Sequence, residues 1–170
     1  FGGFGGALAA SDELLVAGIP GDDFGAGTAV IMSRSLGGWD RTKVLSEVRS
    51  LDPITGAALE CNDGMVGRFP CENVDLISYL PMPAIGGPRG TITNDIWGWT
   101  DSETGRDYAL VGITDRTTFV DVTDPYNPVF VGTLVMTEGA RGSVWRDIKV
   151  HADHAFIVAD ASGEHGVQVF

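Results

Sequence analysis

Residues 94–134 read NDIWGWTDSETGRDYALVGITDRTTFVDVTDPYNPVFVGTL and carry the strongest structural signal in the chain. Runs rich in valine, isoleucine, phenylalanine and tryptophan alternate here with clusters of glycine, proline, asparagine and aspartate, a pattern typical of strands joined by tight turns. We expect strands at residues 95–99, 108–113, 118–122 and 129–134. The segment therefore predicts one antiparallel sheet of four short strands.

The same pattern starts again further along the chain. WRDIKV at residues 145–150 repeats the Asp-Ile pair of residues 95–96, AFIVA at 155–159 repeats ALVG at 109–112, and GVQVF at 166–170 repeats FVDV at 119–122. A period of about 50 residues with several strands in each repeat is typical of a propeller blade or a stacked β-array. One such sheet cannot bury both faces, so neighbouring repeats must cover the other side.

A third repeat is expected at the beginning of the chain. Residues 1–32 contain two apolar runs, at 14–17 and 28–32, joined by a loop rich in glycine and aspartate, and residues 33–44 predict a turn and an edge strand. Phe4-Gly5, LLVAGIP at 14–20 and Gly-Ala-Gly at 25–27 resemble the FG-GAP repeat of integrin-type propellers. Calcium-binding members of that family carry a longer Asp/Asn-rich loop before the second motif, so the resemblance implies no calcium site here.

We therefore predict an all-β, propeller-like fold of four-stranded antiparallel blades. Its parts are an FG-GAP-like blade (residues 1–44), a cysteine-containing insert (45–93), a second blade (94–134) and an incomplete blade (145–170). Propellers typically have 4–8 blades, so we expect the chain to be a fragment of a longer protein. The alternative is an open β-array that closes only by association with other chains.

The composition limits the classes of partner. Hydrophobic residues make up 44% and charged residues 20% of the 170 residues, which is typical of a folded globular protein. The net charge of −12 repels phosphate backbones, so a nucleic-acid partner is disfavoured. No apolar run approaches the ~20 residues that cross a bilayer, so we predict no membrane span in this segment.

The insert contains both cysteines, Cys61 and Cys71, in the segment CNDGMVGRFPC. A disulfide-closed loop is the preferred interpretation, and it would place the protein in an oxidising compartment. The alternatives are half of a metal site or two reduced thiols; Cys-x-x-Cys spacing, which favours zinc or thioredoxin-like chemistry, is absent. Five prolines interrupt the insert, and we expect one short helix at residues 72–80.

The insert and the repeats after it resemble a second family. CNDGMVGRFPCENVDLISYL at residues 61–80, NDIWGWTD at 94–101, WRDIKV at 145–150 and DHAFIVAD at 153–160 are similar to segments of the bacterial choice-of-anchor B proteins. These are exported β-propeller proteins with LVIVD-type repeats. The resemblance implies a secreted or surface-attached protein, and it brings no catalytic residues with it.

Three groups of side chains are candidates for chemistry. Trp97 and Trp99 project to the same face of one strand, where they could stack on sugars or anchor a protein partner, although packing between blades is the more common role of such residues. His151, His154 and His165 could ligate a metal together with Asp153 and Asp160, but polar turn residues are the preferred interpretation. Aspartates recur at the ends of the expected strands, where they form turns more often than acid–base pairs.

The functional expectation is a non-catalytic extracellular or cell-surface module that binds or scaffolds, with Trp97 and Trp99 as binding candidates and a protein or polysaccharide as partner. We predict no cofactor, no metal and no catalytic residue. The alternatives are a structural subunit of a surface assembly, with self-assembly through the unpaired sheets, and a hydrolase or lyase that uses His151, His154 or Asp160 in a propeller funnel. Fold alone does not choose among these functions.

Overall fold

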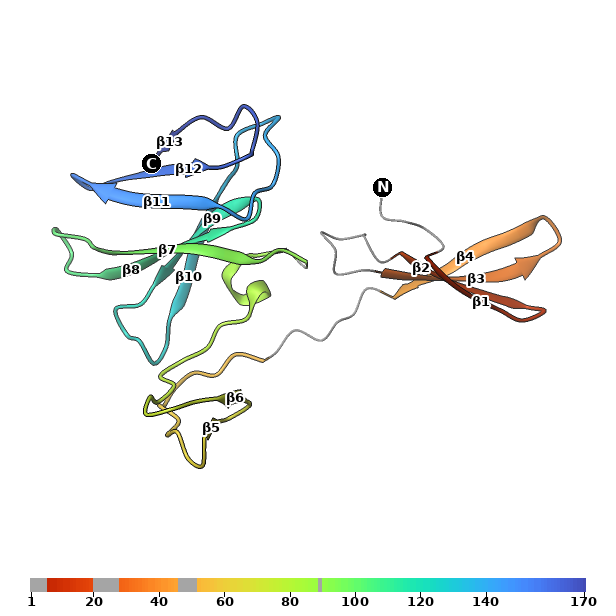
Figure 1. Cartoon of the computed structure of the whole chain (residues 1–170), viewed down its shortest axis with the longest axis horizontal. Coiled ribbons are helices and arrows are strands. Elements are labelled where there is room, and N and C mark those ends of the chain that lie inside the picture. The colour runs from red at the N-terminus through yellow and green to blue at the C-terminus, as the bar shows by residue number, and fades with distance from the viewer. Residues whose placement is uncertain (1–5, 20–27, 46–51, 89) are drawn as a thin grey trace. The chain divides into compact units, whose positions relative to one another are not determined.

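The computed structural model of the chain describes residues 6–19, 28–45, 52–88 and 90–170 (Figure 1). The chain divides into two compact units, Phe1–Ser50 and Leu51–Phe170. Every sheet in the described part is antiparallel, and the one helical element there is a short 3-10 turn, η2 (Met82–Ile85). The predicted all-β class is confirmed.

The first unit contains one sheet, called the N-terminal sheet, with the strand order β1-β2-β3-β4. Its strands are β1 (Ala7–Ala10), β2 (Leu14–Ile19), β3 (Thr28–Ser35) and β4 (Gly38–Leu45). Ala17 and Val30 pair across β2 and β3 and are buried. The strands predicted at residues 14–17 and 28–32 are confirmed, whereas the Phe-Gly and Gly-Ala-Gly motifs of the FG-GAP resemblance lie outside the described residues.

Residues 93–135 form the central sheet, with the order β10-β9-β8-β7. Its strands are β7 (Thr93–Thr100), β8 (Asp107–Ile113), β9 (Arg116–Asp121) and β10 (Val129–Val135). Each predicted strand is present, and each of its ends lies within two residues of the predicted position. The register is regular except for irregularities in β7 and between Phe130 and Gly132 of β10.

The repeat after it forms the C-terminal sheet, of three strands in the order β11-β12-β13. These are β11 (Arg146–His151), β12 (His154–Ala159) and β13 (Gln168–Val169). Ala152 and Asp153 between β11 and β12 both have positive φ, of 48° and 59°. Two such residues make the kind of two-residue turn whose twist matches that of the flanking strands, and His151 and His154 are therefore opposite each other.

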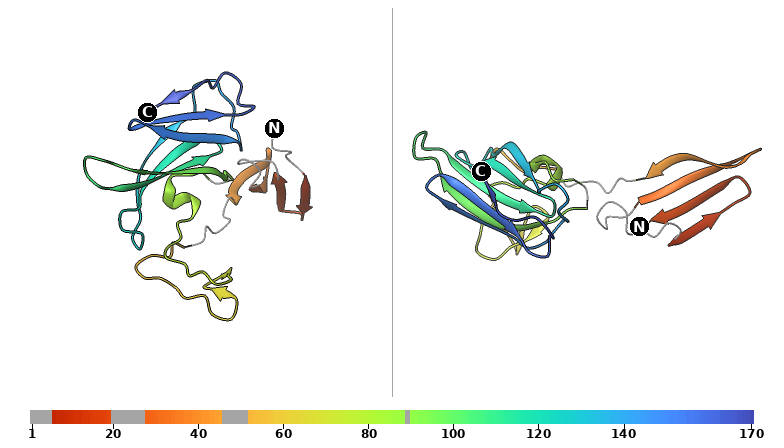
Figure 2. Two further views of the ribbon diagram at one scale, coloured as in Figure 1. Left: turned by 60° about the vertical axis from the view of Figure 1, so that its left-hand side comes forward. Right: turned by 90° about the horizontal axis from the view of Figure 1, so that it is seen from above.

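The central and C-terminal sheets pack face to face, with β11 against β7 and β8 (Figures 1 and 2). Between them lies a core of Leu110, Ile148, Ala155 and Ile157, each at most 5% exposed. A polar link crosses the same interface, because Asp95 Oδ2 of β7 accepts a hydrogen bond from the Ile148 backbone N–H of β11 at 2.7 Å. Each sheet thus buries one face against the other.

Residues 52–88, called the disulfide segment, contain the small hairpin of β5 (Met65–Val66) and β6 (Phe69–Pro70) and then η2. Ile85 of η2 packs on the other face of the central sheet with Ile113 and Val120. The helix predicted at residues 72–80 is wrong: this stretch contains isolated bridges from Leu76 to Leu59 and from Tyr79 to Ile54. Its backbone groups form hydrogen bonds with residues distant in sequence, and these bonds outweigh the local helix propensity.

Candidate ligand-binding cavity between the two sheets

A cavity of about 470 Å³ lies between the central and C-terminal sheets, next to their shared core. Volumes of this size are typical of small-molecule and peptide sites. The walls come from every strand of the central sheet and from the end of the C-terminal sheet that carries the β11–β12 turn. The lining residues are Trp99, Tyr108, Leu110, Phe119, Val131, Gly132, Thr133, Val150, Asp153, Ala155 and Phe170.

Four of the lining residues are aromatic and form two ring pairs. Trp99 and Tyr108 are stacked with ring centroids 5.4 Å apart, and Phe119 and Phe170 are tilted with centroids 5.0 Å apart. Aromatic pairs at such distances add stabilisation beyond the area they bury. Each pair joins two elements that line the cavity: Trp99 of β7 with Tyr108 of β8, and Phe119 of β9 with Phe170 next to β13.

Asp153 contributes the only carboxylate of the lining. It comes from the β11–β12 turn, and its Oδ1 accepts a hydrogen bond from Trp99 Nε1 at 3.2 Å. The bond joins the end of β7 to the end of the hairpin opposite, so the turn positions the indole. The cavity is therefore an apolar, aromatic space with one negative charge at its margin.

The two tryptophans predicted to bind a partner differ in their surroundings. Both are partly buried and pack on the core between the two sheets, and Trp99 also lines the cavity. Trp97 does not line it; its ring faces Lys149, whose Nζ lies 4.8 Å from the ring centroid, a cation–π contact. Packing thus explains both residues, and Trp99 alone is also placed to touch a ligand.

A buried arginine is the polar feature that the sequence reasoning missed. Arg146 of β11 is 4% exposed, and burial lowers its pKa while the charge of Asp115 acts to raise it. Its Nε donates to the Ile113 carbonyl at 2.7 Å, and Nη1 lies 3.0 Å from His165 Nε2. Side chains of β11 alternate between its two faces, and Arg146 lies on the same face as the apolar Ile148. This alternation in the sequence could have predicted that Arg146 is buried.

The three histidines lie in two different settings. His151 and His154 are exposed at the end of the β11–β12 hairpin, where His154 Nδ1 is 2.6 Å from the Ala152 carbonyl. His165 is 4% exposed beside Arg146. Among the residues that the structure describes, no three His, Cys, Asp or Glu side chains come together as a metal site would require.

Aspartates at the strand ends bind their own turns. Asp101 accepts from the Glu103 N–H, Asp121 from the Thr123 N–H and Asp124 from the Tyr126 N–H, at 2.9–3.0 Å. Hydrogen bonds to the ionised form favour it. The pKa of Asp101 is lowered mainly by Thr104, that of Asp121 by Thr123 and that of Asp124 by Asn127. The turn-forming interpretation accounts for these carboxylates.

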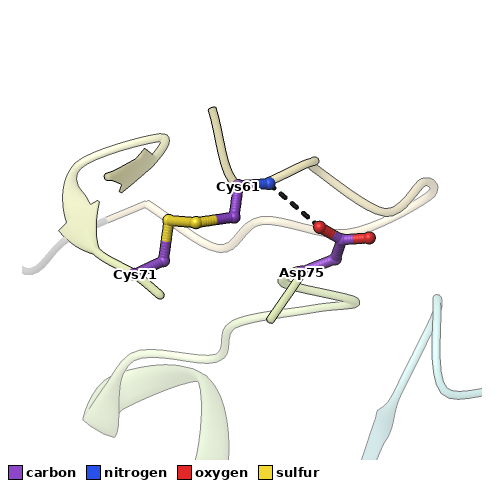
Figure 3. Close-up of a disulfide and its surroundings, with 3 residues drawn as sticks. All are labelled: Cys61, Cys71 and Asp75. Atoms are coloured by element: carbon purple, nitrogen blue, oxygen red, sulfur yellow. Dashed lines mark hydrogen bonds between the residues drawn. A yellow bond between two sulfur atoms is a disulfide. The ribbon is translucent and has the colours of Figure 1, made fainter. Parts of the chain in front are cut away.

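Cys61 and Cys71 form the predicted disulfide, with an S–S distance of 1.95 Å (Figure 3). Asp75 lies beside the bridge, and its Oδ1 accepts a hydrogen bond from the Cys61 N–H at 2.9 Å (Figure 3). The rings of Phe69 and Tyr79, 5.0 Å apart, pack in the same segment. The bridge, the hydrogen bond and the ring pair together hold a loop that has few regular strands.

Comparison with known protein families, curated proteins and solved structures found no match to this chain. In the described residues, no helix is both long enough and apolar enough to cross a membrane.

Proposed function

We propose that this protein is a non-catalytic module of β-propeller type that is exported and that binds or scaffolds a protein or polysaccharide at the cell surface. The observation that carries the proposal is the apolar, aromatic-lined cavity between two sheets related by repetition. A concave apolar site with few polar groups is the usual form of a binding site. Catalysis needs a positioned acid, base or nucleophile, and the lining offers only Asp153 and the Tyr108 phenol as ionisable groups.

The packing of the two sheets supports the propeller part of the proposal. In a propeller each blade is a four-stranded antiparallel sheet, and the blades stand radially around a central channel. The first strands β7 and β11 lie side by side, as neighbouring blades require, and Asp95 of one binds the backbone of the other. Asp147 has the same position in β11 as Asp95 in β7, and it is exposed with Lys149 as its ion-pair partner.

The disulfide supports the proposed location. Disulfides persist in secreted and surface proteins and are rare in the reducing cytosol. The similarity of residues 61–80, 94–101, 145–150 and 153–160 to choice-of-anchor B proteins points to the same location and to an LVIVD-type propeller. Export and membership of that family are predictions. The disulfide on which the export argument rests can be tested in the native chain, whose mass should rise by two hydrogens on reduction.

Binding can be tested by tryptophan fluorescence, since Trp99 lines the cavity. We would titrate the chain with soluble cello- and chito-oligosaccharides and with peptides, and assay the same preparation on chromogenic glycosides and esters. The expected result is a saturable fluorescence change without turnover, weakened about tenfold or more by Trp99→Phe. Trp39→Phe, in β4 of the other unit, is the matched control and should bind as wild type. Turnover of any of these substrates would contradict the proposal.

A surface assembly is the second candidate, favoured by apolar side chains on the open face of the C-terminal sheet. Phe156 is 39% exposed and Val169 is 56% exposed, and they pair on neighbouring strands. Exposed apolar sheet surface of this kind marks interaction sites. This function requires large oligomers at micromolar concentration in size-exclusion chromatography, and a monomer at that concentration would exclude it.

A further inference from the structure

We infer that Arg146 and His165 form an acid-sensitive latch at the interface of the two sheets, closed while the His165 ring is neutral and opened when that ring takes up a proton. The latch is the contact between the Arg146 guanidinium of β11 and the His165 ring, which lies in the connection between β12 and β13 (residues 160–167). The inference is independent of the proposed binding function, because neither residue lines the cavity.

The latch lies in the interior of the molecule. Arg146 and His165 are each 4% exposed, and Arg146 Nη1 lies 3.0 Å from His165 Nε2. The same guanidinium donates through Nε to the Ile113 carbonyl of β8 at 2.7 Å. One side chain of β11 therefore joins the central sheet to the connection that follows β12.

The partners of the His165 ring determine which of its nitrogens carries the hydrogen. Every nitrogen of an arginine side chain is a donor, so His165 Nε2 must accept the hydrogen bond from Arg146 Nη1. His165 Nδ1 lies 3.1 Å from the Gly166 carbonyl oxygen, which can only accept. The two contacts therefore assign a neutral ring with its hydrogen on Nδ1.

A protonated His165 ring cannot keep this contact. Both nitrogens of a protonated histidine are donors, so an N–H at Nε2 would face the N–H of Arg146 Nη1. A second positive charge would also stand 3.0 Å from the guanidinium, and like charges at close range disfavour each other. Arginine does not lose its proton in proteins, so Arg146 cannot relieve the conflict. Uptake of a proton by His165 therefore opens the latch.

The neighbouring charges do not offset this conflict. Burial lowers the pKa of Arg146 and the charge of Asp115, in the β8–β9 turn, acts to raise it, but the carboxylate of Asp115 already accepts hydrogen bonds from Arg116 at 2.9 and 2.8 Å. The charged side chains of the two connections at this end of the sheets, residues 136–145 and 160–167, are all exposed, and water screens them. These are Glu138, Arg141, Asp160 and Glu164.

The other bonds of the 160–167 connection join groups that do not titrate. Thr137 Oγ1 donates to the His165 carbonyl at 2.9 Å, and the Arg141 N–H donates to the Ser162 carbonyl at 3.0 Å. These bonds hold the connection to residues 136–145 at any pH. The latch is therefore the part of this end of the sheet pair that responds to mild acid.

The direction of the pH effect follows from proton uptake. A histidine in an unfolded chain takes up a proton at about pH 6.5, whereas the closed latch has no place for one. The unfolded state then binds more protons than the folded state as the pH falls, so the folded state loses stability. One such proton raises the unfolding equilibrium constant by about tenfold between about pH 7.5 and about pH 5.5.

Urea unfolding of the full chain at these two pH values tests the latch. Wild type should show the tenfold change, whereas His165→Gln should change by less than about twofold, because a glutamine oxygen can accept from Arg146 and does not titrate. The matched control is His151→Gln, since His151 is exposed at the end of β11. This control should respond to pH as wild type does.

Nitrogen-15 NMR of the histidine rings in wild type is a second measurement that needs no variant to fold. At about pH 7.5, His165 should carry its hydrogen on Nδ1 and none on Nε2, and its protonation should coincide with the fall in stability. A hydrogen on Nε2 at that pH would overturn the inference. An equal pH response of wild type and His165→Gln would overturn it too, as would a pH response that His151→Gln removes.

Discussion

At the scale of single residues, Arg146 is a buried charged group that should be costly to remove. Its guanidinium is buried and bonded to the Ile113 carbonyl and to His165, while Nη2 has no partner in the described residues. Arg146→Ala would remove the hydrogen bond to the Ile113 carbonyl and the contact with His165, and it would open a void, so we expect a loss of about 3 kcal/mol in the free energy of unfolding. Arg146→Met should lose less, since it keeps the volume and removes the unpaired nitrogen. Urea unfolding followed by tryptophan fluorescence measures both.

The control for this change is Arg141→Ala, because Arg141 is exposed. An exposed substitution away from special features changes stability by no more than about 0.5 kcal/mol. Equal stability of Arg146→Ala and Arg141→Ala would show that the buried guanidinium contributes nothing to the interface between the sheets.

Asp115 gives a pH dependence with a defined sign. The hydrogen bonds from Arg116 lower the pKa of Asp115 below its ordinary value of 3.8. A carboxyl with a lowered folded-state pKa stabilises above the unfolded value, and this contribution is lost as the pH falls through the folded value. We expect Asp115→Asn to unfold at lower urea than wild type at pH 7, by no more than about 1 kcal/mol for a partly exposed pair. The difference between the two proteins should shrink below pH 3.8; a difference that grew on acidification would contradict the assignment.

At the scale of elements, the disulfide segment depends on its bridge. Closing a loop with a sequence separation of 10 between the cysteines stabilises by about 3 kcal/mol on the chain-entropy estimate. We expect the double variant Cys61→Ser, Cys71→Ser to lose hydrogen-exchange protection in the bonds that join Leu59 to Leu76 and Ile54 to Tyr79. Strands β8, β9 and β12 should keep their protection, because Leu110, Phe119 and Ile157 hold them in the core between the two sheets. Loss of protection in all of them together would show that the segment is part of one cooperative unit.

The same elements show what the sequence could predict. Strands β7 to β12 were predictable because alternation and turn residues act locally, as in the Thr100–Asp107 connection with Gly105 at φ 71°. The helix predicted at residues 72–80 failed for the opposite reason. The partners of Leu76 and Tyr79 lie 17 and 25 residues earlier in the chain (76 − 59 and 79 − 54), and no local pattern reports them.

At the scale of the whole molecule, the candidate site depends on how two sheets meet. The sequence placed Trp97 and Trp99 on one face of a strand, and both do pack on the same core. The sequence could not show that only Trp99 lines a cavity. The other walls of that cavity come from Asp153, Phe170 and β10, which lie far from Trp99 in the sequence. The alternation of side chains along a strand shows which residues share a face. Which part of that face stays uncovered depends on how the two sheets are aligned, and a local pattern does not report that.

The last prediction concerns Asp95 and Asp147, which have equivalent positions in two successive repeats. Asp95 accepts the Ile148 N–H across the sheet interface at 2.7 Å, whereas Asp147, one repeat later, is 60% exposed and pairs with Lys149. Hydrogen bonds to charged groups contribute about 1.5–3 kcal/mol, so Asp95→Ala should lower the free energy of unfolding by roughly that amount. Asp147→Ala should change it by less than about 0.5 kcal/mol, as an exposed ion pair does.

If a further blade packs on the open face, Asp147 should become costly to remove in the assembled protein and stay neutral in this chain. Equal effects of the two substitutions in this chain would refute the idea that the same carboxylate links each repeat to the next.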